Sequence, residues 1–95
     1  MIQPDLRPGE QLIRLHRFRF LKPSGCALSG VDVVVEEQLG PLPAGAARCT
    51  ARPDHSQFVP RPELTVSGDS VEEALSRCLA AIRPRRFLDL FLPTQ

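Results

Sequence analysis

The sequence predicts a small α+β fold, in which an antiparallel sheet of three to four strands carries one amphipathic helix packed on one face. Three observations lead to this prediction. Residues 70–82 combine a helix cap with apolar side chains at helical spacing. Residues 31–37 and 46–52 have the composition of two pairing strands, and residues 11–21 alternate basic and aromatic side chains at the period of a strand.

A chain of 95 residues has room for one domain with a limited core. We therefore expect a single domain over residues 1–95. Residues 1–9 contain two prolines and a glycine, and are expected to form an irregular N-terminal arm. Residues 85–95 form an apolar C-terminal tail.

The helix has the strongest local signal. Ser70 and Glu73 form a capping box, in which the serine oxygen accepts the Glu73 amide and the glutamate reaches back to the Ser70 amide. Glu73 and Arg77 are spaced for an i,i+4 ion pair, and Pro84 ends the helix. The apolar stripe consists of Val71, Ala74, Leu75, Cys78, Leu79 and Ile82.

Residues 11–21 form the first expected strand. The alternation of apolar residues changes phase near His16, which we interpret as a bulge or a strand buried partly on both faces. Residues 22–30 are expected to form a loop. Residues 63–67 form a short edge strand that leads into the helix.

The second and third expected strands, at residues 31–37 and 46–52, pair antiparallel as a hairpin. One register sets Glu36 opposite Arg48, and Asp32 opposite Arg52, so that both charge pairs are satisfied. The inner face then holds valines of the second strand and small residues of the third. These are Val31, Val33, Val35, Ala47, Cys49 and Ala51.

The order of these signals resembles the HicB-like antitoxin domain of bacteria. The chain reads VDVVVEEQLG, then ARCTARPDHS, then a proline-rich turn and ELTVSGDSVEEALSRCLAAI. In that family a strand ends in an acidic, glycine-containing turn, a second strand follows, and a third leads through Gly-Asp-Ser/Thr-x-Glu-Glu-Ala into a helix. The resemblance covers about residues 31–82 and implies a non-catalytic protein-binding module. Too few residues follow Ile82 for a helix-turn-helix unit, so we expect no DNA-binding extension.

The sequence shows no constellation of catalytic residues. It lacks a Gly-x-Ser-x-Gly motif, a P-loop and a dinucleotide fingerprint. His16, His55 and the cysteines lack the close spacing of zinc ligands, and Cys49 with His55 is the nearest approach. Glu36 and Glu37 are adjacent on a strand, so they point to opposite faces. We expect no enzyme activity, no cofactor and no metal.

Residues 14–20 are the first segment with the chemistry to bind a partner. Arg14, Arg17 and Arg19 lie among aromatic residues, a pattern that can hold phosphates and stack bases. The alternative is that this charge only discourages unwanted pairing at a sheet edge.

The C-terminal tail is the second such segment. A basic hinge followed by an apolar stretch can dock on a partner by strand addition or by placing its phenylalanines in a groove. As alternatives, the tail forms a final strand or a helical turn, or closes over the chain's own sheet. The expected partner-binding residues are Arg85, Arg86, Phe87, Leu88, Leu90 and Phe91.

A net charge of +1 gives no global field toward an anionic partner, and no apolar stretch is long enough to cross a bilayer. With three separated cysteines, we expect a cytoplasmic protein with no membrane association. The expected function is HicB-like occupation of a partner protein's surface, of antitoxin or inhibitor type. The alternative is an accessory structural subunit of a larger protein or nucleoprotein assembly, whose Arg-rich strand contacts nucleic acid. A homodimer through strand edges is a further expected arrangement.

Overall fold

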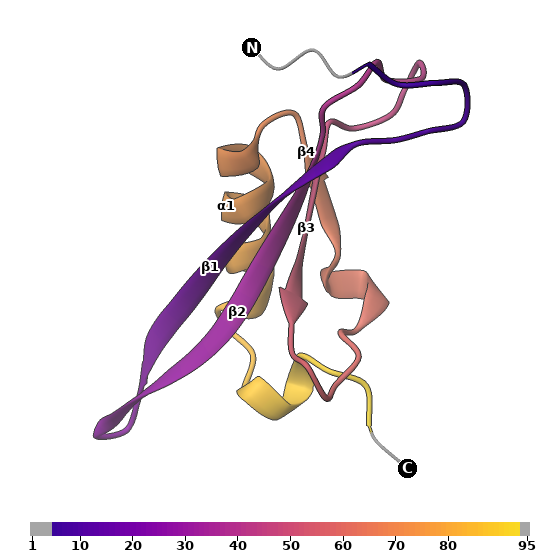
Figure 1. Cartoon of the computed structure of the whole chain (residues 1–95). Coiled ribbons are helices and arrows are strands. Elements are labelled where there is room, and N and C mark those ends of the chain that lie inside the picture. The colour runs from indigo at the N-terminus through magenta and orange to yellow at the C-terminus, as the bar shows by residue number, and fades with distance from the viewer. Residues whose placement is uncertain (1–4, 94–95) are drawn as a thin grey trace.

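A computed structural model describes residues 5–93 and shows a four-stranded antiparallel sheet with one helix on one of its faces (Figure 1). This confirms the expected α+β fold. Residues 1–4 of the expected arm and 94–95 of the expected tail lie outside the described residues. The elements in chain order are β1 (Ile13–Ser24), β2 (Ala27–Gln38), β3 (Cys49–Asp54), the 3₁₀ turn η1 (Pro62–Leu64), β4 (Val66–Gly68), α1 (Val71–Ile82) and the 3₁₀ turn η2 (Phe87–Asp89).

Helix α1 begins as its sequence predicts. Ser70 is the N-cap, and its Oγ accepts the Glu73 amide at 3.1 Å. The Glu73 carboxylate reaches the Asp69 amide at 3.4 Å, so the expected return bond to the Ser70 amide is wrong by one residue. The same carboxylate oxygen contacts Arg77 at 3.1 Å, as the i,i+4 spacing predicts. The helix ends at Ile82, before Pro84.

Gly68 sets the distance between β4 and α1. A Cβ at this position would lie 2.7 Å from the Ala74 backbone nitrogen, closer than real Cβ contacts allow. Only glycine therefore lets the first turns of the helix approach the strand this closely. β4 is an edge strand, as expected for residues 63–67. It is shorter than expected, because residues 63 and 64 belong to η1, which begins at Pro62.

β1 and β2 form a long hairpin rather than a strand followed by a loop. Every residue of β1 pairs with one of β2, so the expected bulge near His16 is wrong. The expected loop at 22–30 is also wrong, because a two-residue turn at Gly25 and Cys26 joins the strands. Gly25 has φ +64°, the sign that a type II′ turn requires at its first central position. Pro23 is tolerated because β1 is an edge strand.

The change of phase in β1 reflects exposed apolar residues rather than a bulge. Phe20 is half-buried on the face that α1 covers, whereas Leu15 points to the opposite, outer face and is 63% exposed. Apolar residues therefore occur on both faces of one regular strand. The second interpretation, a strand with apolar residues on both faces, is therefore the nearer one, although the outer residues are exposed rather than buried.

The register between β2 and β3 differs from the expected one by two residues. Glu36 lies opposite Thr50 rather than Arg48. Arg52 replaces the expected partner through a diagonal contact, in which its Nη1 donates to Glu36 Oε1 at 2.8 Å. Arg48 donates instead to the Gln38 carbonyl oxygen at 2.6 Å. A shift of two residues keeps each side chain on its face, so the expected burial of the inner-face valines and Cys49 is confirmed.

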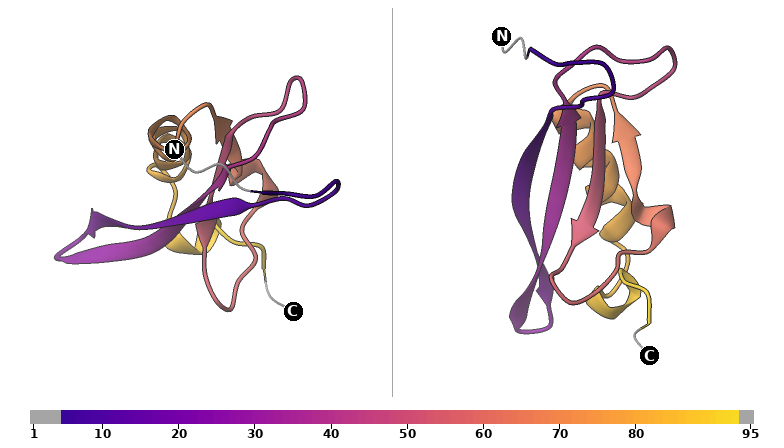
Figure 2. Two further views of the ribbon diagram at one scale, coloured as in Figure 1. Left: turned by 45° about the horizontal axis from the view of Figure 1, so that its top comes forward. Right: turned by 45° about the vertical axis from the view of Figure 1, so that its right-hand side comes forward.

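The core lies between α1 and the inner face of the sheet, and the C-terminal segment closes one end (Figure 2). Phe91 forms a bridge with Pro60. The Arg61 amide donates to the Leu90 carbonyl oxygen at 3.0 Å. Of the expected alternatives for the tail, the structure therefore combines a helical turn with closure over the chain's own domain. The core residues are Val31, Val33, Val35, Cys49, Ala51, Leu64, Ala74, Cys78, Ile82, Leu90 and Phe91.

Among the residues described, the helices are too short or too polar to span a bilayer.

Candidate functional site

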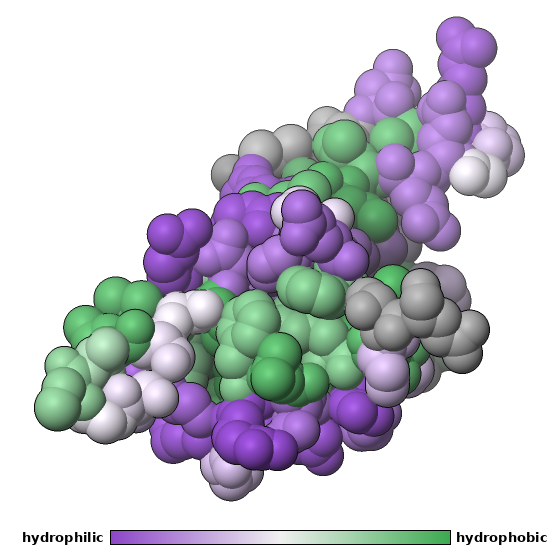
Figure 3. All heavy atoms as spheres, turned by 90° about the horizontal axis from the view of Figure 1, so that it is seen from below, coloured by the Kyte–Doolittle hydropathy of each residue, from purple (hydrophilic) through white to green (hydrophobic). Residues whose placement is uncertain are grey.

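One end of the molecule carries exposed apolar side chains from three parts of the chain (Figure 3). We call it the apolar end and define it by Leu21 and Leu28 at the hairpin tip, Val59 before η1, and Leu88 and Leu92 of the C-terminal segment. Their exposure runs from 38% for Leu92 to 76% for Leu88. Several exposed apolar side chains gathered at one end of a molecule are typical of interaction sites.

The hairpin tip contributes to this end because β1 and β2 continue past the end of α1 (Figure 1). Leu21 lies opposite Gly30, and Pro23 lies opposite Leu28 on the same outer face. A Cβ at Gly30 would lie 2.8 Å from Leu21 Cδ2. The glycine thus leaves room for the leucine to lie flat across β2.

The C-terminal segment contributes through η2. Leu88 points outward from this turn, whereas Leu90 and Phe91 are buried below it. Arg61 Nε donates to the Asp89 carbonyl oxygen at 2.9 Å, and the Leu92 amide donates to the Val59 carbonyl oxygen at 2.7 Å. These bonds hold the exposed leucines on a fixed backbone.

An aromatic cluster lies beneath the apolar end. The ring of His55 packs against Phe58, Phe87 and Phe91 with centroid separations of 4.7 to 5.9 Å. His55 Nδ1 accepts the Gln57 amide at 3.0 Å. Phe87 lines one hollow beside the hairpin tip and another beside the C-terminal leucines, so it joins the two parts of the apolar end.

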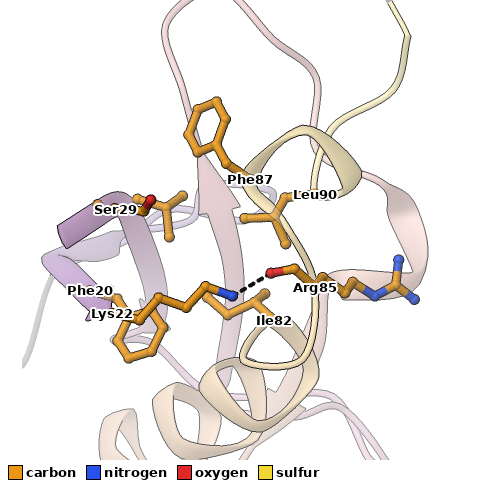
Figure 4. Close-up of a pocket in the computed structure, with 9 residues that line it drawn as sticks. Phe20, Lys22, Ser29, Ile82, Arg85, Phe87 and Leu90 are labelled. Carbon is orange, nitrogen blue, oxygen red and sulfur yellow. Dashed lines mark hydrogen bonds between the residues drawn. The ribbon is translucent and has the colours of Figure 1, made fainter. Parts of the chain in front are cut away.

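Lys22 ties the hairpin to the end of α1 (Figure 4). Its Nζ donates to the Arg83 carbonyl oxygen at 2.9 Å and to the Arg85 carbonyl oxygen. A cation at this position satisfies free carbonyls at a helix C-terminus and complements the helix dipole. The Arg83 guanidinium lies 5.7 Å from the centre of the Phe20 ring.

A cavity of about 20 Å³ lies beside Lys22, lined by Phe20, Ile82, Phe87 and Leu90 (Figure 4). This volume holds about one water molecule. Its lining is largely apolar, and it is far smaller than the roughly 300–1,000 Å³ of small-molecule sites. The cavity is therefore a packing defect between hairpin, helix and tail rather than a substrate pocket.

The outer face of the sheet is charged and internally paired. Arg17 Nη1 contacts Asp54 at 2.8 Å and Asp32 at 3.3 Å, and Arg19 Nε contacts Asp32 at 2.9 Å. The hydrogen bond from Arg19 lowers the pKa of Asp32. Asp32 lies opposite Asp54, not opposite Arg52 as expected, and Arg17 bridges the two carboxylates.

The structure does not bring the three expected phosphate-binding arginines together. Arg17 and Arg19 lie on the outer face of β1, but Arg14 points to the other face with His16. His16 Nε2 and the Glu37 carboxylate lie 2.9 Å apart.

The structure divides the expected partner-binding residues of the tail. Leu90 and Phe91 belong to the core, whereas Leu88 and Arg86 are exposed. Arg86 contacts Asp89 at 3.1 Å and lowers the pKa of that carboxyl. The other two are partly exposed: Arg85 lies 3.9 Å from a Glu63 oxygen, and Phe87 packs on the core edge.

Two of the three cysteines are structural. Cys49 and Cys78 are fully buried, and burial raises the pKa of both thiols, that of Cys78 to about 11. Both stay protonated near neutral pH, which suits a small apolar core residue and not a nucleophile. Cys26 is exposed in the hairpin turn. Over residues 5–93, no three potential metal ligands gather at one place.

Sequence reasoning missed the hairpin tip, because Leu28 lies within residues 22–30, which were expected to form a loop, and Leu21 lies just before them. A signal was present. Ser24-Gly25-Cys26-Ala27 places glycine first in a two-residue turn between apolar residues, which is typical of a type II′ hairpin.

Comparisons with protein-family models, curated proteins and solved structures found no match to this chain.

Proposed function

We propose that this protein is a small non-catalytic binding module of the HicB-like antitoxin or inhibitor type, which acts in the cytoplasm by covering a partner protein with its apolar end. The observation that carries the proposal is the exposure of leucines from two distant segments on one surface. Burying this surface against a partner contributes roughly 25 cal/mol per Å² of apolar area, from which the entropy cost of association is subtracted. The resemblance over residues 31–82 supplies the antitoxin or inhibitor part of the proposal.

Part of this surface is held by specific bonds, which supports a binding role. Lys22 fixes the base of the hairpin tip to α1, and Arg61 fixes η2 to the loop before η1. The leucines of the C-terminal segment are thus held in one conformation and lose little entropy on binding. The protonated buried thiols support the non-catalytic part of the proposal.

The rival function, a subunit of a nucleoprotein assembly that touches phosphate through β1, has less support. Arg17, Arg19 and Arg52 on the outer face are matched by Asp32, Glu36 and Asp54. Phosphate binding there would require these arginines to exchange existing ion pairs. Such exchange gains little net energy at an exposed surface.

A homodimer through the free edge of β1 also has little support. β1 carries Arg14, Arg17, Arg19 and Lys22 but no carboxylate. A second copy paired antiparallel would bring like charges close together, which is destabilising in a sheet. The strand therefore favours a different chain as the partner.

Affinity purification of the tagged full chain from its native host, with and without nuclease, tests the proposal. Leu28→Gln removes an apolar contact from the apolar end. Leu15→Gln is a matched control, because the two leucines are 65% and 63% exposed on the same face of the hairpin. We expect one partner of toxin size to stay bound after nuclease treatment. It should bind the wild type and Leu15→Gln, and be lost with Leu28→Gln.

Two results would contradict the proposal. Release of all associated proteins by nuclease would favour the nucleoprotein subunit. Equal binding by the two variants and the wild type would show that the apolar end is not the contact. A purified partner that inhibits growth, and is silenced by co-expression of this chain, would support the antitoxin type.

A further inference from the structure

The apolar end is surrounded by an excess of positive charge. Three of its cations have no carboxylate partner among the described residues: Lys22 and Arg61 donate to carbonyl oxygens, and Arg83 lies over the Phe20 ring. Arg86 is paired with Asp89 at 3.1 Å, and Arg85 reaches Glu63 only at 3.9 Å. Arg19 and Asp32, which line the hollow beside the hairpin tip, pair with each other, so that six cations face three carboxylates.

This excess is local. The whole sequence has a net charge of +1, so the remainder of the molecule is negative. The outer face of the sheet, by contrast, pairs three arginines with three carboxylates. The C-terminus of α1 points at the same end and offsets about half a unit of charge, which leaves the end clearly positive.

A hollow of about 200 Å³ opens within this charged surface, between the aromatic cluster and the C-terminal leucines. Phe58, Phe87, Leu88 and Leu92 line it, and Arg61 lies at its side. The volume is below that of typical small-molecule sites but is large enough for one branched or aromatic side chain.

We infer that the apolar end binds an acidic segment of the partner protein, whose carboxylates face the cations and whose branched or aromatic side chain enters this hollow. The inference rests on the proposed function and adds the chemistry of the partner. Charge complementarity of this kind fixes the orientation of a complex and rejects basic competitors.

Two other anionic partners fit the surface less well. Single-stranded nucleic acid needs exposed aromatic faces for stacking, but Phe87 and Phe91 pack against His55. An anionic membrane would meet the exposed leucines but offers no single side chain for the hollow. A protein segment uses both the charge and the hollow.

Selection of a phage-displayed library of random 12-residue peptides on the full chain tests the inference. We expect enrichment of peptides that combine aspartate or glutamate with leucine or phenylalanine. A selected peptide should shift the amide resonances of residues 28 and 88 in a spectrum of the ¹⁵N-labelled chain. Its affinity should fall as salt is added.

Charge reversal gives the matched comparison. Arg83→Glu with Arg85→Glu should weaken a selected peptide by about tenfold, because Arg83 has no carboxylate partner among the described residues, Arg85 has only a distant one, and each reversal replaces attraction by repulsion. Arg7→Glu with Arg14→Glu changes net charge equally at residues outside the apolar end and should leave affinity within about twofold. Thermal melts of both double variants establish that each is folded.

The inference is overturned if the enriched peptides are neutral or basic, if no peptide is enriched, or if both double variants weaken binding equally. Preferential binding of a 12-nucleotide single-stranded RNA, or of phosphatidylglycerol vesicles, would overturn it in favour of those partners. Native purification of a nuclease-resistant partner does not depend on these outcomes, so the proposed function stands or fails separately.

Discussion

Replacing Lys22 by methionine removes the ammonium group that joins the β1–β2 hairpin to the end of α1. Methionine keeps an unbranched apolar chain of similar length, so packing against Phe20 is largely preserved. The Arg83 and Arg85 carbonyl oxygens lose their donor. The change therefore isolates the two hydrogen bonds and the charge from the apolar contacts.

The expected cost follows from these contacts. Hydrogen bonds to a charged group contribute about 1.5–3 kcal/mol, and Lys22 is only partly buried, which favours the lower value. We expect Lys22→Met to lower the free energy of unfolding by about 1.5 kcal/mol. In a domain of this size that corresponds to a fall in Tm of roughly 6–12 °C.

Thermal and urea unfolding followed by circular dichroism measure this difference. Arg14→Met is the control, because Arg14 lies on the same strand and the same face and has no polar partner among residues 5–93. Its Tm should change little. If Lys22→Met melts within about 2 °C of Arg14→Met, water satisfies the two carbonyl oxygens as well as the lysine does. The hydrogen bonds of Lys22 would then contribute nothing to the free energy of unfolding.

Three further predictions concern other parts of the fold. In the native protein at pH 8, Ellman's reagent should modify the exposed Cys26 rapidly. The buried thiols should stay unmodified, including Cys78, whose pKa is raised to about 11. Rapid release of more than one equivalent of the thiolate product would contradict this. Gly68→Ala should lower the Tm strongly, because its Cβ would lie 2.7 Å from the Ala74 backbone nitrogen; an unchanged melting curve would show that α1 can move away freely. The pKa of Asp32 is lowered from 3.8 in the folded state, so its stabilising effect is complete above that value and is lost as pH falls through the folded pKa. Urea unfolding should therefore show wild type more stable than Asp32→Asn at pH 7 and the difference shrinking at pH 3, and a constant difference would refute the ion-pair account.

The parts of the fold that depend on local chemistry were predictable. The cap at Ser70, the apolar stripe of α1 and the valines of β2 each act within a few residues, so the sequence carries their signals directly. The register of β2 against β3 was predicted two residues away from the true one. A slip of two residues leaves every side chain on the same face, so burial cannot distinguish the registers, and Arg52 reaches Glu36 diagonally.

The candidate site was less predictable because it depends on contacts between distant segments. The tail sequence suggested binding residues, but only the bridge between Phe91 and Pro60 decides that Leu90 is buried and Leu88 exposed. The hairpin tip was missed because residues 22–30, which include Pro23, were expected to form a loop. At a sheet edge proline does not interrupt pairing, and edge position is a property of the whole sheet.

The overhang of the β1–β2 hairpin has a thermodynamic consequence. A strand of twelve residues spans about 40 Å, whereas the twelve residues of α1 span about 18 Å. The residues near Gly25 therefore have no helix behind them, and an isolated two-stranded ribbon is only marginally stable. This tip should open before the rest of the fold, and a partner bound to Leu28 would suppress that opening in proportion to its concentration. The free energy of local opening at the tip of β1 and β2 would thus rise as more of the protein is bound to its partner.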